Sequence, residues 1–300
     1  MSTRTPAAYA EHRRLPRSLL ALLLASTFLH CAPSYAQSPY DPVDDVFYQI
    51  MPIAWRDSNN DTNRFGDFGG MTASLPYLEQ LGVTAVWMTP IFPSAAYHGY
   101  QHGPANLLNS RFGTEPQFLA FVAAAHAKNI RVYIDFVAYG ISQGTPYYLS
   151  AYNNPSSPYD YWLAFTNTQN TEYQGYSYNS WDGSFVGFIH WNLDNPSAVN
   201  LNINWANHWL DPNGDGNTSD GVDGFRLDHV YSSAPEGWGA NIGFWQTWKA
   251  GLQQVKPNVF TFAEQGNWGS YGTDLLPAHD AAFTKPFEFA ARDALTAENA

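Results

Sequence analysis

Short apolar runs alternate with stretches of helical periodicity along most of this chain. The runs of strand length cover residues 46–55, 83–88, 131–137, 222–228, 259–264 and 281–287. The stretches with helical spacing cover residues 71–81, 114–125, 200–210, 242–255 and 288–300. Because parallel strands need a crossover connection, which is usually a helix, this alternation predicts a parallel α/β sheet.

The strand at residues 222–228 ends in the most informative pair of side chains. Asp228 is its last residue, and Arg226 points to the same face two residues earlier. A carboxylate beside a guanidinium stays ionised at neutral pH and can act as a nucleophile, although a structural ion pair would give the same pattern. Glu264 ends the next strand. Two acids at the carboxyl ends of neighbouring strands, joined by one helix, match the way a (β/α)8 barrel presents catalytic groups.

These patterns predict an α/β fold of the (β/α)8 TIM barrel type. About six strands are present where a closed barrel has eight, so we expect an incomplete barrel. Between residues 139 and 199 Pro, Asn, Ser, Tyr and Trp dominate, which predicts an irregular excursion domain after strand 3. The expected organisation is a signal peptide at 1–36, barrel strands 1–3 at 37–138, the excursion at 139–199, and barrel strand 4 to helix 6 at 200–300.

The N-terminal segment has the pattern of a secretory signal peptide. Three arginines precede an apolar run at residues 19–29, and Ser34 and Ala36 offer small residues at the cleavage positions. The run is too short for a confident membrane span. Cleavage after Ala36 would also remove Cys31, which is the single cysteine. We therefore expect a periplasmic or secreted protein that needs no disulfide and no membrane contact after cleavage.

Charge and aromatic content narrow the choice of partner. The formal net charge of −12 argues against a nucleic-acid backbone as partner. Aromatic residues make up 16% of the chain, and aromatic faces stack on the apolar faces of sugar rings. This composition suits a carbohydrate site, although a large core with ordinary surface aromatics would give the same percentage.

Two loops carry carboxylate and amide oxygens at alternate positions, which suits Ca²⁺. The first loop offers Asp57, Asn59, Asp61 and the later Asp67, and the second offers Asp211, Asn213 and Asp215. Neither loop has the bidentate Glu of an EF-hand at the twelfth position. The alternative is a polar turn held by side-chain hydrogen bonds to the backbone. The second loop enters a strand, so an ion there would be structural rather than catalytic.

Several ordered segments resemble glycoside hydrolase family 13, the α-amylase family, from about residue 46 to the end. They are Tyr97-His98-Gly99-Tyr100, Arg111-Phe112-Gly113-Thr114, Ile134-Asp135-Phe136-Val137, Val199-Asn200-Leu201-Asn202, Gly224-Phe225-Arg226-Leu227-Asp228 and Ala263-Glu264. Any one of these segments is a weak signal, but all of them in this order indicate the family.

The resemblance implies a retaining glycosidase that acts on α-linked glucans or maltooligosaccharides. Asp228 would form a covalent glycosyl-enzyme, and Glu264 would act first as acid and then as base. The resemblance also implies that Tyr100 stacks on the sugar being cleaved and that His98 bonds a hydroxyl. The residues expected to bind or support the substrate are Arg226, Tyr100, His98 and Asp135.

The sequence departs from the family pattern in three places. Tyr139 and Gly140 occupy the positions of an Asn-His pair that helps to bind calcium and the sugar. Tyr231 and Ser232 replace the basic residue and the His that touch the leaving side. The third family carboxylate follows strand seven, beyond Ala300. We therefore expect the 300-residue piece by itself to be inactive or nearly so.

Three functions fit this sequence. The leading one is an extracytoplasmic α-amylase-type hydrolase of starch or maltodextrins. A maltodextrin α-glucosidase or transglycosylase is an alternative, which product analysis would distinguish. A non-catalytic carbohydrate-binding barrel is a third reading, but such a scaffold has no physical need for both Asp228 and Glu264.

Overall fold

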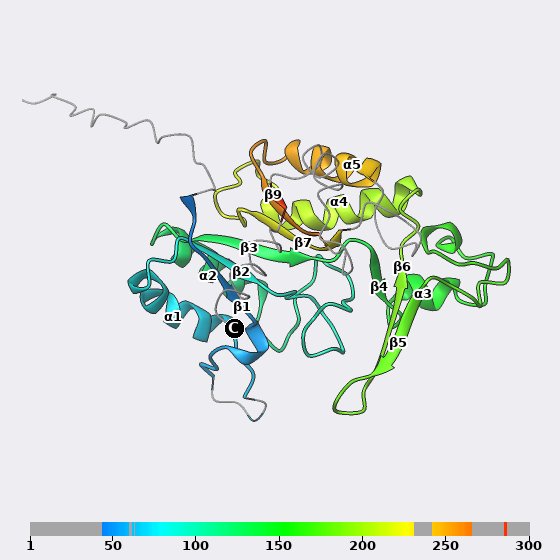
Figure 1. Cartoon of the computed structure of the whole chain (residues 1–300), viewed down its shortest axis with the longest axis horizontal. Helices are drawn as coiled ribbons and strands as arrows, with labels where there is room; N and C mark the ends of the chain where they lie inside the picture. The colour runs from blue at the N-terminus through cyan, green and yellow to red at the C-terminus, as the bar shows by residue number, and fades with distance from the viewer. Residues whose placement is uncertain (1–43, 60–61, 63, 231–241, 266–284, 287–300) are drawn as a thin grey trace, which may run out of the picture. The chain divides into compact units, whose positions relative to one another are not determined.

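A parallel sheet organises the part of the chain that the computed structural model describes, which is residues 44–59, 62, 64–230, 242–265 and 285–286. Within these residues the sheet has six strands in the order β1-β2-β3-β7-β8-β9 (Figure 1). The strands are β1 (Phe47–Ile50), β2 (Ala85–Met88), β3 (Arg131–Phe136), β7 (Gly224–Val230), β8 (Phe260–Gln265) and β9 (Lys285–Pro286). Every neighbouring pair is parallel, which confirms the predicted parallel α/β sheet.

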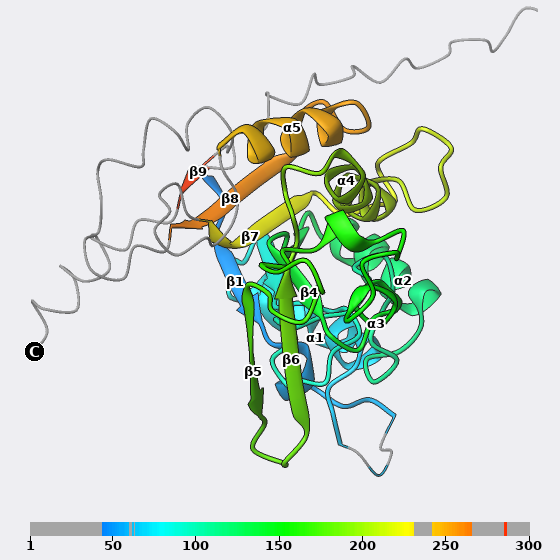
Figure 2. The same ribbon diagram turned by 90° about the vertical axis from the view of Figure 1, so that its right-hand side faces the viewer.

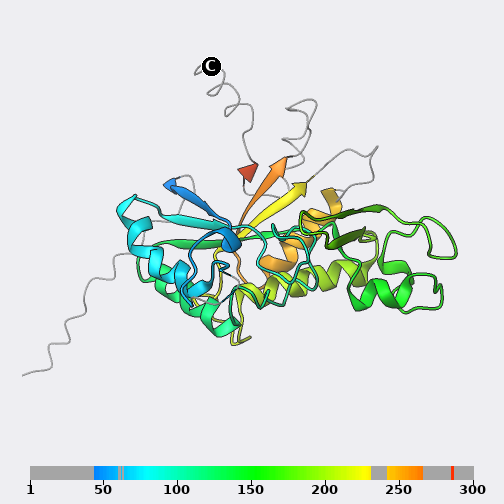
Figure 3. The same cartoon turned by 90° about the horizontal axis from the view of Figure 1, so that it is seen from below.

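The larger helices lie on one face of this sheet (Figure 3). They are α1 (Phe68–Gln80), α2 (Glu115–His126), α4 (Pro196–Leu210) and α5 (Ile242–Gln253). A strand, a helix and the next parallel strand therefore follow one another along the chain, as in part of a (β/α)8 barrel. The signal peptide at 1–36, most of the strand predicted at 281–287, and the helix predicted at 288–300 lie outside the described residues.

Capping side chains explain why some elements begin earlier than the hydrophobic pattern predicts. Asp67 accepts a hydrogen bond from Gly70 N at 2.6 Å, so α1 starts at Phe68. Asn195 caps α4 in the same way through Ser197 N at 2.9 Å, with Pro196 as the first helical residue. The first strand is shorter than predicted, because a 3₁₀ turn, η2 (Pro52–Ala54), follows it.

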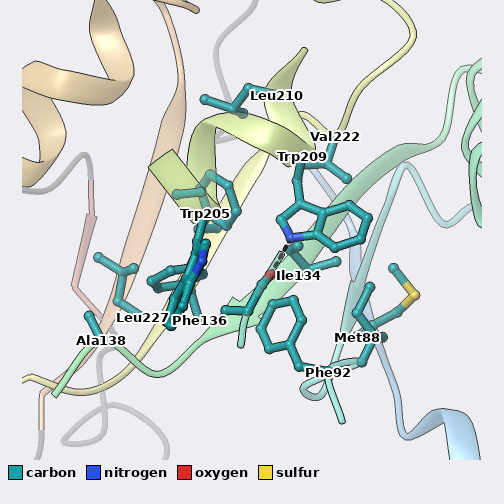
Figure 4. Close-up of a cluster of buried hydrophobic side chains, with 14 of the residues drawn as sticks. Met88, Phe92, Ile134, Phe136, Ala138, Trp205, Trp209, Leu210, Val222 and Leu227 are labelled. Carbon is teal, nitrogen blue, oxygen red and sulfur yellow. Dashed lines mark hydrogen bonds between the residues drawn. The ribbon is translucent and has the colours of Figure 1, made fainter. Parts of the chain in front are cut away.

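The face of the sheet that carries the helices forms the main hydrophobic core. Figure 4 shows side chains of β2, β3 and β7 meeting two tryptophans of α4. The residues labelled there are Met88, Phe92, Ile134, Phe136, Ala138, Trp205, Trp209, Leu210, Val222 and Leu227. Trp209 is fully buried, and its Nε1 donates to Ala105 O at 2.6 Å, so its polar atom is satisfied inside the core. This core fixes α4 against the strands that carry the acids.

The opposite face of the sheet combines an aromatic cluster with polar residues. Ala85, Tyr133, Phe260 and Phe262 pack together there, with Trp87 against them. Because side chains alternate along a strand, the next residues on this face of β3 and β8 are Asp135 and Glu264. The sheet therefore changes from aromatic to charged along this face, toward the carboxyl ends of its strands.

A second, smaller sheet occupies the segment predicted as an excursion (Figures 1 and 2). Its antiparallel strands β4 (Gly140–Ser142), β6 (Phe185–His190) and β5 (Gly175–Asn179) lie in that order, accompanied by α3 (Pro146–Ala151) and η3 (Asp160–Trp162). The excursion is thus more regular than its composition suggests. Five of the six residues of β6 are buried, whereas β5 is mostly exposed and gives a weak hydrophobic signal.

One carboxylate lies at the start of β7, at the end of the sheet away from the acids. Asp223 accepts hydrogen bonds from Val132 N and from His126 Nε2, each at 2.8 Å. Burial alone would raise the pKa of Asp223, but these bonds and the charge of Lys256 outweigh it and lower the pKa. Asp223 therefore ties α2, β3 and β7 together as an ionised group.

Candidate active site

The register between β3 and β7 places Asp135 directly beside Arg226. Arg226 Nη1 donates to Oδ1 and Oδ2 of Asp135 at 2.9 Å each. Asp135 is fully buried, and only 4% of the Arg226 surface is exposed. A buried pair of this kind is held by both charge and hydrogen bonds.

The same guanidinium also reaches the two acids predicted to be catalytic. Its Nη1 donates to Asp228 Oδ1 at 2.6 Å, and its Nη2 lies 2.7 Å from Glu264 Oε2. Alternation explains the arrangement, because Asp228 is two residues beyond Arg226, and Glu264 is two residues beyond the residue paired with Arg226. Arg226 thus joins carboxylates from three neighbouring strands at one point.

The strand β7 is irregular immediately after Asp228. The register with β8 shifts between Leu227 and Val230, and His229 has a left-handed backbone with φ 52°. The His229 amide donates to Glu264 Oε2 at 3.1 Å. The irregularity therefore turns a backbone donor toward the second acid.

Two aromatic side chains cover this group of charges. Tyr100 donates its hydroxyl to Asp135 Oδ2 at 3.0 Å, and Trp87 Nε1 donates to the same oxygen at 3.3 Å. The Arg226 guanidinium lies over both rings, 5.1 Å from the Trp87 centroid and 5.9 Å from that of Tyr100. Sequence reasoning missed Trp87, although its place on the inner face of β2 was available from strand alternation.

His98 lies one step further from the acids. Its ring is 5.5 Å from that of Tyr100, and its Nε2 is 3.1 Å from the hydroxyl of Tyr178 on β5. Burial lowers the pKa of His98, so the ring is neutral. The structure therefore brings His98 next to Tyr100 and the excursion sheet, and the contacts described here do not join it to the carboxylates.

Two buried carboxylates, Asp135 and Asp228, and the partly buried Glu264 share one guanidinium. Burial, reinforced by Glu264, raises the pKa of Asp135 to about 6 against the opposing effect of Arg226. Burial also raises the pKa of Asp228 well above its usual range, although Arg226 lowers it. Arg226 thus acts on Asp228 in the direction expected from the sequence, but burial and the neighbouring carboxylates outweigh its effect on the pKa.

Comparison with known proteins agrees with this geometry. Residues 49–268 match the family model for the catalytic domain of α-amylase. The chain belongs to the α-amylase catalytic-domain family. The family fold is a (β/α)8 barrel, and the six parallel strands within the described residues are the matching part of it.

Individual relatives in this family cover most of the chain. Alpha-amylase 3 of Dictyoglomus thermophilum is 30% identical over 263 residues, which are 83% of this chain and 48% of that protein. Trehalose synthase of a Pimelobacter species is 30% identical over 203 residues, which are 62% of this chain and 34% of that protein. The solved α-amylase from H. orenii has a TM-score of 0.67 at 26% identity, covering 84% of this chain and 53% of that one. The chain thus spans about half, or less, of the length of each of these family members.

Packing explains why Tyr139 and Gly140 stand where the α-amylase family pattern has an Asn-His pair. Tyr139 is buried, with its ring 5.4 Å from the ring of Phe188 and 5.4 Å from that of His229. A Cβ at Gly140 would lie 2.3 Å from Cε1 of Phe188. A histidine side chain therefore does not fit at Gly140 unless Phe188 moves. Tyr231 and Ser232, where the other departure was noted, lie outside the described residues.

In the first loop predicted as a calcium site, Asp67 accepts hydrogen bonds from the backbone and from a serine. Asp67 caps α1, and its oxygens also accept from Ser58 N at 2.9 Å and Ser58 Oγ at 2.7 Å. Asp57 Oδ1 accepts from Asn59 N at 3.0 Å. Asp61 lies outside the described residues. Asp67 is therefore engaged by hydrogen-bond donors rather than facing an open ligand position.

The second loop is a chain of turns in which side-chain oxygens accept backbone N–H groups. Asp211 accepts from Asp215 N and Gly216 N, Asn213 accepts from Asp215 N, and Asp215 accepts from Asn217 N. In the described part of the chain, no three His, Cys, Asp or Glu side chains gather as a metal site would require. The hydrogen bonds of the second loop are those of polar turns, which was the alternative to a calcium site.

Proposed function

We propose that this protein is a retaining glycoside hydrolase that cleaves α-glucosidic bonds in starch or maltodextrins. The observation that carries the proposal is the contact of one buried guanidinium with both Asp228 and Glu264 at the carboxyl ends of β7 and β8. The arrangement holds a nucleophile and a proton donor on one face of the sheet, next to the aromatic ring of Tyr100.

In the first step, an Asp228 oxygen bonds to the anomeric carbon while the bond from that carbon to the leaving oxygen breaks. Glu264 gives its proton to the leaving oxygen. In the second step, water attacks the anomeric carbon, Glu264 takes a proton from the water, and the bond to Asp228 breaks. Arg226 stabilises whichever carboxylate is ionised at each stage, because it contacts both.

The test is the stereochemistry of the product. Full-length protein would be incubated with maltopentaose while proton NMR follows the first hemiacetal formed. The α anomer is expected to appear first, and Asp228→Asn is expected to lower turnover by several orders of magnitude. Initial release of the β anomer would exclude retention. An Asp228→Asn protein that kept more than about a tenth of the rate would exclude Asp228 as nucleophile.

Transglycosylation is the second candidate function, and the similarity to a trehalose synthase favours it. The same covalent intermediate would pass its glycosyl group to a sugar hydroxyl instead of to water. Chromatography of the products distinguishes the two outcomes. Shorter maltodextrins indicate hydrolysis, and longer or rearranged oligosaccharides indicate transfer.

We propose in addition that the protein is exported to the periplasm or secreted. The support is the arginine-flanked apolar run within residues 1–36. N-terminal sequencing of protein recovered from the periplasm or the medium would test this. A mature N-terminus after Ala36 is expected, and an intact Met1 in the cytoplasmic fraction would contradict the proposal.

A further inference from the structure

The segment that carries Tyr100 has a second side chain that reaches the sheet. His102 follows Tyr100 by two residues, and only 1% of its surface is exposed. Its Nε2 lies 3.1 Å from Val137 O, and its Nδ1 lies 2.6 Å from Gly103 O. Val137 directly follows β3, two residues after Asp135. Tyr100 and His102 therefore contact the chain two residues apart at the carboxyl end of β3.

The His102 ring is a neutral hydrogen-bonding group. Burial lowers its pKa, although the two carbonyl oxygens favour the charged form. A neutral imidazole has one N–H, so the ring donates to one of the two carbonyls at a time. A bond to Gly103 O stays within the segment, because Gly103 is the next residue. A bond from Nε2 to Val137 O joins the segment to the end of β3.

Other contacts hold the same segment to different parts of the chain. Gly103 N donates to Pro93 O at 2.6 Å. Ser142 N, on β4, donates to His102 O at 2.8 Å. The ring of Phe92 packs against that of His102, with centroids 5.1 Å apart. These contacts fix the segment relative to its own loop and to β4, whereas the Nε2 contact fixes it relative to β3.

We propose that the bond from His102 Nε2 to Val137 O makes His102 a positioning residue for Tyr100. It holds the Tyr100 hydroxyl at 3.0 Å from Asp135 Oδ2 and keeps the ring beside the Arg226 guanidinium. A hydrogen bond weakens steeply with small displacements, so a segment that is loosened from β3 loses this contact while the protein stays folded. The inference rests on the proposed hydrolase function, in which Tyr100 lies next to the reacting sugar.

The test compares His102→Gln with His102→Asn in the full-length protein, with maltopentaose as substrate. The amide nitrogen of Gln lies one bond further along the side chain, so Gln can keep the Nε2 bond to Val137 O. Asn reaches only as far as Nδ1, toward Gly103 O. His102→Phe keeps a ring against Phe92 and removes both nitrogens. Each variant is also made in a Tyr100→Phe background, and thermal melting is recorded for all of them.

His102→Asn and His102→Phe are expected to lower kcat/KM about three- to tenfold, as loss of one hydrogen bond predicts, while His102→Gln keeps more than about half of the wild-type value. In the Tyr100→Phe background the same substitutions should change kcat/KM less than about twofold, because the contact through which they act is already absent. If His102→Asn does not fold, the comparison of His102→Gln with His102→Phe replaces it.

Three results would overturn this inference and spare the hydrolase proposal. The first is an equal kcat/KM for His102→Gln and its comparison variant. The second is a His102→Gln protein that does not fold. The third is a loss of kcat/KM that persists undiminished in the Tyr100→Phe background, which would show a general structural role. Absence of maltopentaose hydrolysis by the wild-type protein would overturn both proposals.

Discussion

Removal of the Arg226 guanidinium should change how the active-site acids ionise. Arg226→Met keeps a long side chain of similar length but removes the charged guanidinium. It therefore deletes every contact of that group with Asp135, Asp228 and Glu264. Leaving a buried charge without its partner costs about 3–5 kcal/mol. One pKa unit corresponds to about 1.4 kcal/mol. Asp135 and Asp228 should therefore take up protons at higher pH in this variant, because protonation avoids that cost.

The sign of the effect on the rate follows from the proposed role of Asp228 as the nucleophile. The nucleophile must be ionised, so a higher pKa leaves less of it active at a given pH. The acidic limb of the kcat/KM profile for maltopentaose should therefore move upward by at least about one unit in Arg226→Met, with the largest loss of rate at acidic pH. The assay is initial rate against pH at constant ionic strength, together with thermal melting.

Arg131→Met is a matched control for this experiment. Arg131 pairs with Asp45 at 2.8 Å, at the opposite end of β3 from Asp135. Its replacement should lower the melting temperature without moving the acidic limb. If Arg226→Met remains folded and its acidic limb coincides with that of the wild type, the argument that the guanidinium sets the protonation of these acids is wrong.

Four further outcomes are expected. Tyr100→Phe removes the hydroxyl bonded to Asp135 and should lower kcat/KM about three- to tenfold, whereas a change below twofold would show that only the ring matters. Asp223→Asn should lower stability at pH 7 by about 1–3 kcal/mol, as urea unfolding measures. Because the pKa of Asp223 is lowered from 3.8, this difference should shrink as the pH falls below 3.8, and a gap that persists at lower pH would contradict the assignment. Gly224→Ala should prevent stable folding, since its Cβ would lie 1.8 Å from Phe260 O, and a melting temperature equal to the wild type would refute this packing. Chelation of calcium should leave the melting temperature unchanged, because turn hydrogen bonds engage the oxygens of the second loop, and a clear fall would show that a bound calcium ion stabilises the protein.

Sequence patterns located the strands of the parallel sheet, because buried parallel strands are continuous apolar runs with clear ends, but they did not locate β4, β5 and β6 in the excursion. Asp228 and Glu264 could be identified from their positions at those ends, and strand alternation alone places Arg226 on the face of Asp228. The capping residues Asp67 and Asn195 were less visible, because a polar residue before a helix is also an ordinary loop residue.

The pKa shifts of the site residues could not be predicted from the sequence pattern. The pKa of Asp228 depends on burial and on Asp135 and Glu264, which reach it only through the register of three strands. The backbone of His229 is likewise set by the register shift between β7 and β8, which no residue pattern encodes. Alternating Asp and Asn residues are equally compatible with a cation site and with turns, and the hydrogen bonds of the second loop are those of turns.

Trapping of the covalent intermediate tests the central claim most directly. Full-length protein would be treated with an activated fluorinated α-maltosyl donor that slows the second step, digested, and sequenced by mass spectrometry. The account predicts a glycosyl adduct on Asp228, which is lost in Asp228→Asn. An adduct on a different carboxylate, or turnover of the donor with no adduct at all, would contradict the assignment of Asp228 as the nucleophile.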